Sequence, residues 1–182
     1  MSLLDIEAFN KTPLQTEPFE YLTVPGFVRQ ERIAAILADY PAIEKGGSYP
    51  LIALDYGPVF GKLCTELQGA PLQEAFAKKF DMDLTERPTT LTVRGRCRPK
   101  DGQIHTDSDS KLMTVLVYLN ETWDADGGRL RLLRSEDTLE DMIAEVPPEA
   151  GSMVCFRNRE NAWHGHSSFD GVRRVLQLNW VT

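Results

Sequence analysis

The chain has 182 residues, with 42% hydrophobic and 26% charged residues, a composition that argues against a disordered or membrane-embedded protein. Its formal net charge of −7 argues against nucleic acid as a partner, because phosphate contacts need an excess of Lys and Arg. The three cysteines are far apart and lack zinc-motif spacing, and no apolar run has the length of a signal peptide or a membrane span. We therefore expect a cytoplasmic protein without a membrane partner.

The first ninety residues are expected to be a helix-rich support. Residues 1–18 are polar and predict a loosely held lead-in, and the alternating residues 19–24 predict a strand. Apolar residues at helical spacing predict helices over residues 30–40, 59–68 and 71–80. Residues 44–58 are rich in Gly and Pro and predict a loop, with a short strand at 51–54.

From residue 91 onward the pattern changes to short strands separated by turn residues. The predicted strands cover residues 91–98, 103–106, 112–120, 129–134, 142–146, 152–158, 163–167 and 174–181. Many short strands in half a chain indicate an antiparallel barrel or jelly roll. We expect one α+β, mainly β domain over residues 1–182, with the helices packed on one outer face.

Two histidines and one aspartate form the strongest candidate site. In an extended strand, residues two apart share a face, so His105 and Asp107 are expected to point the same way. His164, on a later predicted strand, would complete a set of two imidazoles and one carboxylate, which is the facial triad of non-haem Fe(II) oxygenases. Taken alone, an HxD tripeptide is more often an exposed turn than a site, and a lone histidine can be a buried packing residue.

The motifs around these residues extend the pattern. They are HTD (105–107), VLVYLNETW (115–123), GGRLRLL (127–133), PPEAGSMVCFRN (147–158), WHGH (163–166) and RRVLQLNW (173–180). In order and spacing, this half of the chain resembles the 2-oxoglutarate/Fe(II)-dependent dioxygenase superfamily, in its prolyl-4-hydroxylase-like branch. The resemblance implies a cupin-like double-stranded β-helix that uses Fe(II), 2-oxoglutarate and O2. Ascorbate is a further candidate cofactor.

The resemblance also implies roles for individual residues. His105, Asp107 and His164 would be the catalytic metal ligands, and a basic residue shortly after the second histidine would pair with the distal carboxylate of 2-oxoglutarate. Arg173 and Arg174 both fit by position. We predict Arg174, because it shares a face with Trp180, taken as the family's inward tryptophan, and we expect Arg173 to face solvent.

Other residues are assigned to the cosubstrate pocket. Tyr118 matches a tyrosine that contacts 2-oxoglutarate in the family, and Leu130 follows the Gly-Gly pair at a pocket-lining position. Core packing alone would also explain both residues. His166 shares the face of His164 and is expected to line the pocket rather than to replace His164 as a ligand.

A basic stripe precedes the HTD motif. Arg94, Arg96 and Arg98 alternate with small or apolar residues, which gives a strand one basic face. That face would either meet solvent or point into the barrel. We predict that at least Arg98 points inward, with Arg96 a second candidate, and that the substrate is anionic, because a buried guanidinium needs a partner.

Together these observations predict an oxidoreductase that hydroxylates a small, anionic metabolite and releases succinate and CO2. Three alternatives remain at this point. The chain could be a prolyl or peptidyl hydroxylase that acts on a protein, a cupin-like metal-binding module without oxygenase activity, or a hydrolase or isomerase that uses zinc in the same triad.

Overall fold

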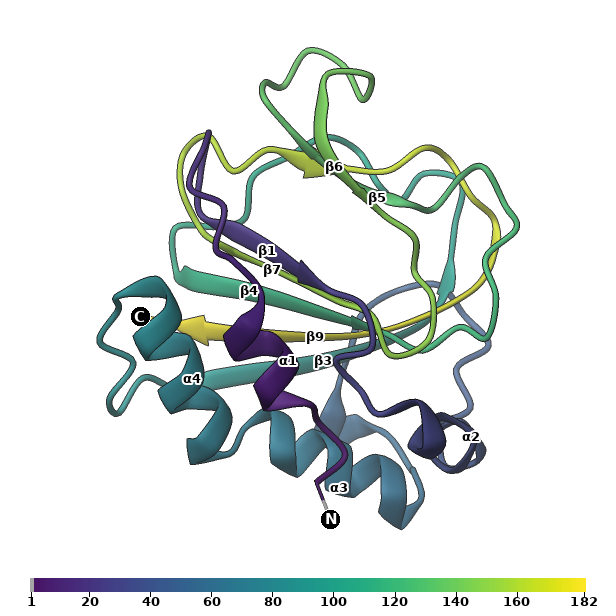
Figure 1. Cartoon of the computed structure of the whole chain (residues 1–182). Coiled ribbons are helices and arrows are strands. Elements are labelled where there is room, and N and C mark those ends of the chain that lie inside the picture. Colours follow the sequence, from purple (N-terminus) through teal and green to yellow (C-terminus); the bar gives the residue numbers. More distant parts are fainter. Residues whose placement is uncertain (1) are drawn as a thin grey trace.

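The computed structural model in Figure 1 describes residues 2–182 as two facing β-sheets with helices on one outer side. The larger sheet has the strand order β1 (Tyr21–Val24), β7 (Met153–Arg157), β4 (Lys111–Tyr118), β9 (Gly171–Val181), β3 (Thr89–Cys97) and β2 (Tyr49–Pro50). The smaller sheet has the order β6 (Met142–Val146), β5 (Leu130–Leu133) and β8 (His164–Gly165). The paired strands are antiparallel throughout. The predicted mainly β, jelly-roll architecture is confirmed.

The helices lie against the larger sheet, on the side away from the smaller one (Figure 1). They are α1 (Ile6–Lys11), α2 (Gln30–Ala38), α3 (Pro58–Leu67) and α4 (Ala70–Phe80), with a 3-10 turn at Leu51–Ala53. The predicted helices agree with α2, α3 and α4 to within two residues. None of the helices over residues 2–182 combines the length and the hydrophobicity needed to cross a lipid bilayer.

Three local predictions were wrong. The expected loose lead-in contains α1, whose first turn is capped by the Asp5 carboxylate and whose Phe9 is fully buried against Phe76. The strand expected at residues 51–54 is the 3-10 turn. The strand expected at residues 103–106 is reduced to a single bridge between His105 and His164. For α1, the packing of Phe9 against Phe76 overrides the weak local pattern.

The central strands of the larger sheet are buried on both faces. One face packs on the helices and contributes Met113, Val115, Val117, Leu176, Leu178 and Trp180 to that core. The other face points toward the smaller sheet and contributes Leu116, Tyr118, Val154, Phe156 and Val175. Because side chains alternate along a strand, the odd-numbered residues of β9 from Arg173 to Asn179 face the space between the sheets.

Trp180 therefore points away from the barrel interior, contrary to the sequence-based expectation. Its ring centroid lies 5.1 Å from that of Phe76 on α4, and its side chain is almost fully buried. The tryptophan joins the sheet to the helical layer.

We expect Trp180→Ala to lower the free energy of unfolding by about 3–5 kcal/mol, because it leaves a cavity between β9 and α4. Chemical denaturation monitored by circular dichroism would measure the change. Val172→Ala is the matched control, since Val172 lies on the same strand and is 51% exposed. Equal stability of the two variants would contradict the packing described here.

Candidate active site

A cavity of about 380 Å3 opens between the two sheets. This volume is within the usual range of small-molecule sites, roughly 300–1,000 Å3. Its wall contains the three candidate metal ligands, the apolar side chains of Leu116, Leu130 and Val175, and four cationic side chains, which are Arg94, Lys100, Lys111 and Arg173. A cavity of this composition suits a small, negatively charged ligand.

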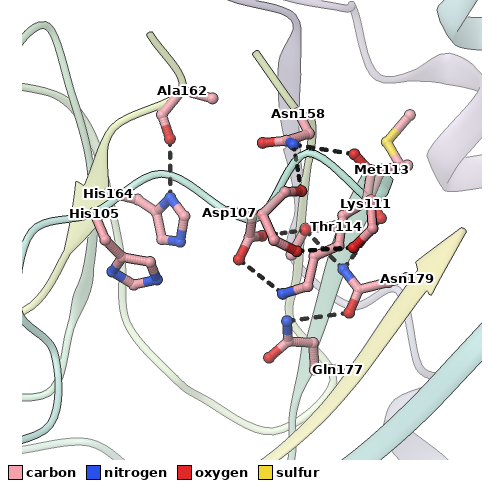
Figure 2. A network of polar contacts seen from close by, with 12 residues as sticks. His105, Asp107, Lys111, Met113, Thr114, Asn158, Ala162, His164, Gln177 and Asn179 are labelled. Carbon is pink, nitrogen blue, oxygen red and sulfur yellow. Dashed lines mark hydrogen bonds and ion pairs between the residues drawn. The ribbon is translucent and has the colours of Figure 1, made fainter. Parts of the chain in front are cut away.

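The structure brings His105, Asp107 and His164 together. One potential ligand atom from each residue lies within 4.8 Å of the others. His105 and His164 form an antiparallel bridge, in which each backbone nitrogen donates to the other residue's carbonyl oxygen at 3.0 Å. Figure 2 shows the two rings side by side, with Asp107 across from them. The bridge thus aligns the histidines without the longer strand that the sequence predicted.

Both imidazoles are held in the form that a metal requires. The Nδ1 of His105 lies 2.7 Å from the carbonyl oxygen of Gln103, and the Nδ1 of His164 lies 3.0 Å from that of Ala162. A carbonyl oxygen only accepts, so each Nδ1 carries a hydrogen, and the neutral form of such a ring has its free lone pair on Nε2. Burial lowers the pKa of His164 to about 4, with His105 adding to the effect, so His164 is neutral at pH 7. The donor set therefore fits a divalent transition metal such as Fe(II).

Asp107 is fixed by a chain of hydrogen bonds from β4 and β9 (Figure 2). Its Oδ2 accepts from the hydroxyl of Thr114, and its Oδ1 pairs with the Nζ of Lys111 at 2.8 Å. Asn179 donates to the Thr114 hydroxyl at 2.8 Å, and Gln177 donates to Asn179 at 3.2 Å. The carboxylate is oriented by residues on the inner faces of two neighbouring strands.

The same contacts keep Asp107 ionised. Burial alone would raise the pKa of this carboxyl, but the hydrogen bonds from Lys111 and Thr114 outweigh burial and hold the pKa below its usual range. An ionised carboxylate is the form that binds a hard divalent cation.

Arg173, not Arg174, faces the cavity. The Arg173 side chain is 7% exposed, and its Nε donates to the carbonyl oxygen of Gly128 at 2.8 Å. Its guanidinium also lies over the ring of Tyr118, 5.3 Å from the centroid. Arg174 lies on the helix side, with its guanidinium 5.7 Å from the centroid of the Tyr40 ring. The prediction of Arg174 as the cavity-facing arginine was wrong, because it rested on an inward Trp180.

Gly128 helps to position Arg173. Its φ of +77° lies in the left-handed region, and a Cβ atom there would come within 2.7 Å of the Trp123 ring. A side chain at this position would be strained and crowded. Glycine therefore allows the turn that presents its carbonyl oxygen to the Arg173 guanidinium.

Leu130 and His166 border this space, and Tyr118 packs against Arg173. Tyr118 is fully buried, and its hydroxyl lies 3.5 Å from Nη2 of Arg173. Leu130 and His166 line the cavity itself. The Nδ1 of His166 lies 2.9 Å from the carbonyl oxygen of Ser167, and its Nε2 lies 4.0 Å from the thiol of Cys97. Their roles toward a cosubstrate stay predictions.

The basic stripe is arranged differently from the prediction. Arg94 lines the cavity, whereas Arg98 pairs with Asp101 at 2.9 Å and Arg96 pairs with the exposed Asp170 at 2.9 Å. The pairing of β3 with β9 shifts register between Arg94 and Arg96. The extra residue of this shift lies on β9, so the three arginines keep one face of β3. Arg96 and Arg98 do not line the cavity, however, and each pairs with an aspartate instead. The inward position predicted for Arg98, with Arg96 as second candidate, was wrong.

Sequence reasoning did not identify several residues of the site. Thr114 and Asn179 are polar residues inside otherwise apolar strands, and this pattern was a usable signal. Lys111 begins β4, four residues after Asp107, and had no distinctive pattern.

Comparison with known families agrees with this geometry. Residues 95–182 match the family model described as the 2OG-Fe(II) oxygenase superfamily, where 2OG is 2-oxoglutarate. They form a 2OG-Fe(II) oxygenase domain. The family implies Fe(II) and 2-oxoglutarate, and this domain indicates an oxidoreductase.

Solved structures resemble the whole chain, including the part before the oxygenase domain. A prolyl-4-hydroxylase from Pseudomonas putida has a TM-score of 0.64 at 17% identity, covering 97% of this chain and 96% of that chain. The viral collagen prolyl hydroxylase vCPH from Paramecium Bursaria Chlorella virus-1, in its 2OG complex, has a TM-score of 0.56 at 18% identity. The match covers 89% of this chain and 96% of that chain. HygX from Streptomyces hygroscopicus, with nickel and 2-oxoglutarate bound, has a TM-score of 0.57 at 15% identity. The match covers 88% of this chain and 81% of that chain. At these identities the likeness is one of fold. No curated protein matches the chain.

We expect Asp107→Asn to weaken Mn(II) binding by more than the roughly 10–100-fold that loss of an outer-shell partner costs, because it removes a charged ligand. Isothermal titration calorimetry would measure the affinity. Asp109→Asn is the matched control, since Asp109 is an exposed carboxylate two residues away. Equal losses in both variants would rule out Asp107 as a ligand.

We expect Thr114→Val to weaken Mn(II) binding by about 10–100-fold, because the substitution keeps the side-chain shape and removes only the hydroxyl that orients Asp107. The same titration applies. Thr90→Val, at an exposed position of β3, is the control. Unchanged affinity in Thr114→Val would show that Lys111 alone suffices to hold the carboxylate.

Proposed function

We propose that the protein is a 2-oxoglutarate- and Fe(II)-dependent dioxygenase that hydroxylates a small molecule and releases succinate and CO2. One observation carries the proposal: the three candidate metal ligands and the buried Arg173 guanidinium line the same cavity. Among residues 2–182, no carboxylate forms an ion pair with Arg173. A buried cation without a carboxylate partner is costly, so an anionic ligand is expected beside it.

The metal would be held by Nε2 of His105 and of His164 and by the carboxylate of Asp107. Bound Fe(II) would supply the O2 activation that couples decarboxylation of 2-oxoglutarate to oxidation of the substrate. The protein's own contribution is to fix these three ligand side chains. The backbone bridge between the histidines and the Thr114 hydrogen bond to Asp107 would do this before a ligand arrives.

Arg173 would bind the distal carboxylate of 2-oxoglutarate. Its Nε is already held by the Gly128 carbonyl, and Tyr118 packs against its guanidinium plane, so the remaining N–H donors are pre-oriented. Hydrogen bonds between charged partners contribute about 1.5–3 kcal/mol each. The Tyr118 hydroxyl, close to Nη2, would donate to the same carboxylate. The neighbouring apolar side chains of Leu116, Leu130 and Val175 would keep water out of the site.

The first experiment is succinate release from the purified protein with Fe(II), 2-oxoglutarate and O2. We expect slow turnover that requires all three, is lost in His164→Ala and rises when the substrate is added. Ascorbate would be tested as an additive in the same assay. Binding of Zn(II) with no affinity for 2-oxoglutarate would instead favour a zinc enzyme or a metal-binding module.

The two adjacent arginines give a matched test. We expect Arg173→Gln to weaken 2-oxoglutarate binding to the Mn(II)-loaded protein by about tenfold or more, because it removes a charge-assisted contact. Arg174→Gln, which removes the same charge on the opposite face of β9, should change the affinity by less than about twofold. Calorimetry would measure both, and the reverse order would restore Arg174 as the cosubstrate residue.

A further inference from the structure

Arg94 is the second arginine in the cavity wall, and its strand lies on the opposite side of β9 from the strand of Tyr118. Val175 on β9 pairs with Tyr118 of β4 on one side and with Arg94 of β3 on the other. Arg173 contacts Tyr118 and Gly128, on the β4 side. The Arg94 backbone is fixed as well, since its carbonyl oxygen accepts from the Tyr40 hydroxyl at 2.7 Å. Arg94 therefore reaches the cavity from a different strand and a different direction.

The Arg94 guanidinium has no hydrogen-bond or ion-pair partner anywhere in residues 2–182. It is half-buried, and burial lowers its pKa although the nearby Asp101 carboxylate, which is paired with Arg98, acts in the opposite direction. Its neighbours on β3 differ in this respect, because Arg96 and Arg98 each have an aspartate at 2.9 Å. An unpaired guanidinium facing a cavity is a site for an anion from outside the chain.

The other charges of the cavity are already used. The carboxylate of Asp101 accepts from Arg98, and that of Asp107 pairs with Lys111. Under the proposed function, Arg173 is neutralised by the distal carboxylate of 2-oxoglutarate. Within residues 2–182, this leaves Arg94 and Lys100 as the cavity-lining cations without a partner.

We propose that Arg94, together with Lys100, binds an anionic group of the substrate that is oxidised, so that the enzyme acts on a carboxylate- or phosphate-bearing small molecule. The inference rests on the proposed function and specifies its substrate class. Arg94 offers a planar pair of N–H donors that matches either anion, and Lys100 supplies a second charge from the adjoining loop.

The test uses the full-length protein saturated with Mn(II) and with 2-oxoglutarate, so that the Arg173 site is filled. Inorganic phosphate and acetate are then titrated at constant ionic strength by calorimetry. We expect at least one anion to bind the wild type, and Arg94→Gln to weaken it by about tenfold or more. The stronger of the two anions indicates whether the substrate group is a phosphate or a carboxylate.

Two further variants make the result specific. Arg96→Gln removes the same charge from a neighbouring position whose side chain is exposed, and it should change anion binding by less than about twofold. Lys100 lies in an exposed loop, so Lys100→Gln should weaken anion binding without affecting folding. Arg94→Gln should leave 2-oxoglutarate affinity within about threefold of the wild type, which separates it from Arg173→Gln.

Three results would overturn the inference while leaving the proposed function intact. These are no anion binding to the wild type, equal binding to Arg94→Gln and the wild type, or a loss of 2-oxoglutarate affinity in Arg94→Gln as large as in Arg173→Gln. The last result would assign Arg94 to the cosubstrate. Failure of the Mn(II)-loaded wild type to bind 2-oxoglutarate at all would instead reject the proposed function.

Discussion

The site depends on one strand, β9, whose two faces are buried in different environments. Even-numbered residues such as Leu176 and Trp180 pack against the helices, while odd-numbered residues such as Arg173 and Asn179 face the space between the sheets. The packing of the large Trp180 against α4 fixes which set faces which way, because a shift of one residue would exchange the two sets. The hydrophobic contact on one side therefore determines the position of the charges on the other.

The interior of the barrel combines apolar packing with a high density of charge. Polar groups that leave water must find partners inside the protein, and most of those in the site do. Asp107 has Thr114 and Lys111, and both histidines have backbone carbonyl partners. Such fixed partners orient the functional atoms in advance and so reduce the entropy lost when a ligand binds.

The convergence of the three candidate metal ligands and the general fold could be predicted from the sequence, but the choice of arginines could not. The HTD motif and His164 are local signals with characteristic neighbours, and the strands are separated by clear turn residues. Arg173 and Arg174 are adjacent on β9 and therefore face opposite sides of the sheet. Which of them faces the cavity can be deduced only once the direction of Trp180 on the same strand is known. The alternation along β3 places Arg94, Arg96 and Arg98 on one face, but it does not show which of them lies beside the cavity. Only the three-dimensional structure shows that Arg94 lines the cavity and that Arg98 does not.

Thr114 and Asn179 illustrate a different limit. Each could be recognised as a polar residue within an apolar strand, but their contact joins positions 65 residues apart. Only the pairing of β4 with β9 places them opposite each other.

The bridge between His105 and His164 also bears on how such a protein can diversify. The two candidate ligands are held by reciprocal backbone hydrogen bonds and not by the intervening chain. The loops between β4 and β5 and between β5 and β6 lie within that interval. Loops tolerate insertions far better than strands do, so these segments could lengthen or change composition while the distance between the histidines stayed constant. New substrate contacts could arise there without rebuilding the metal centre.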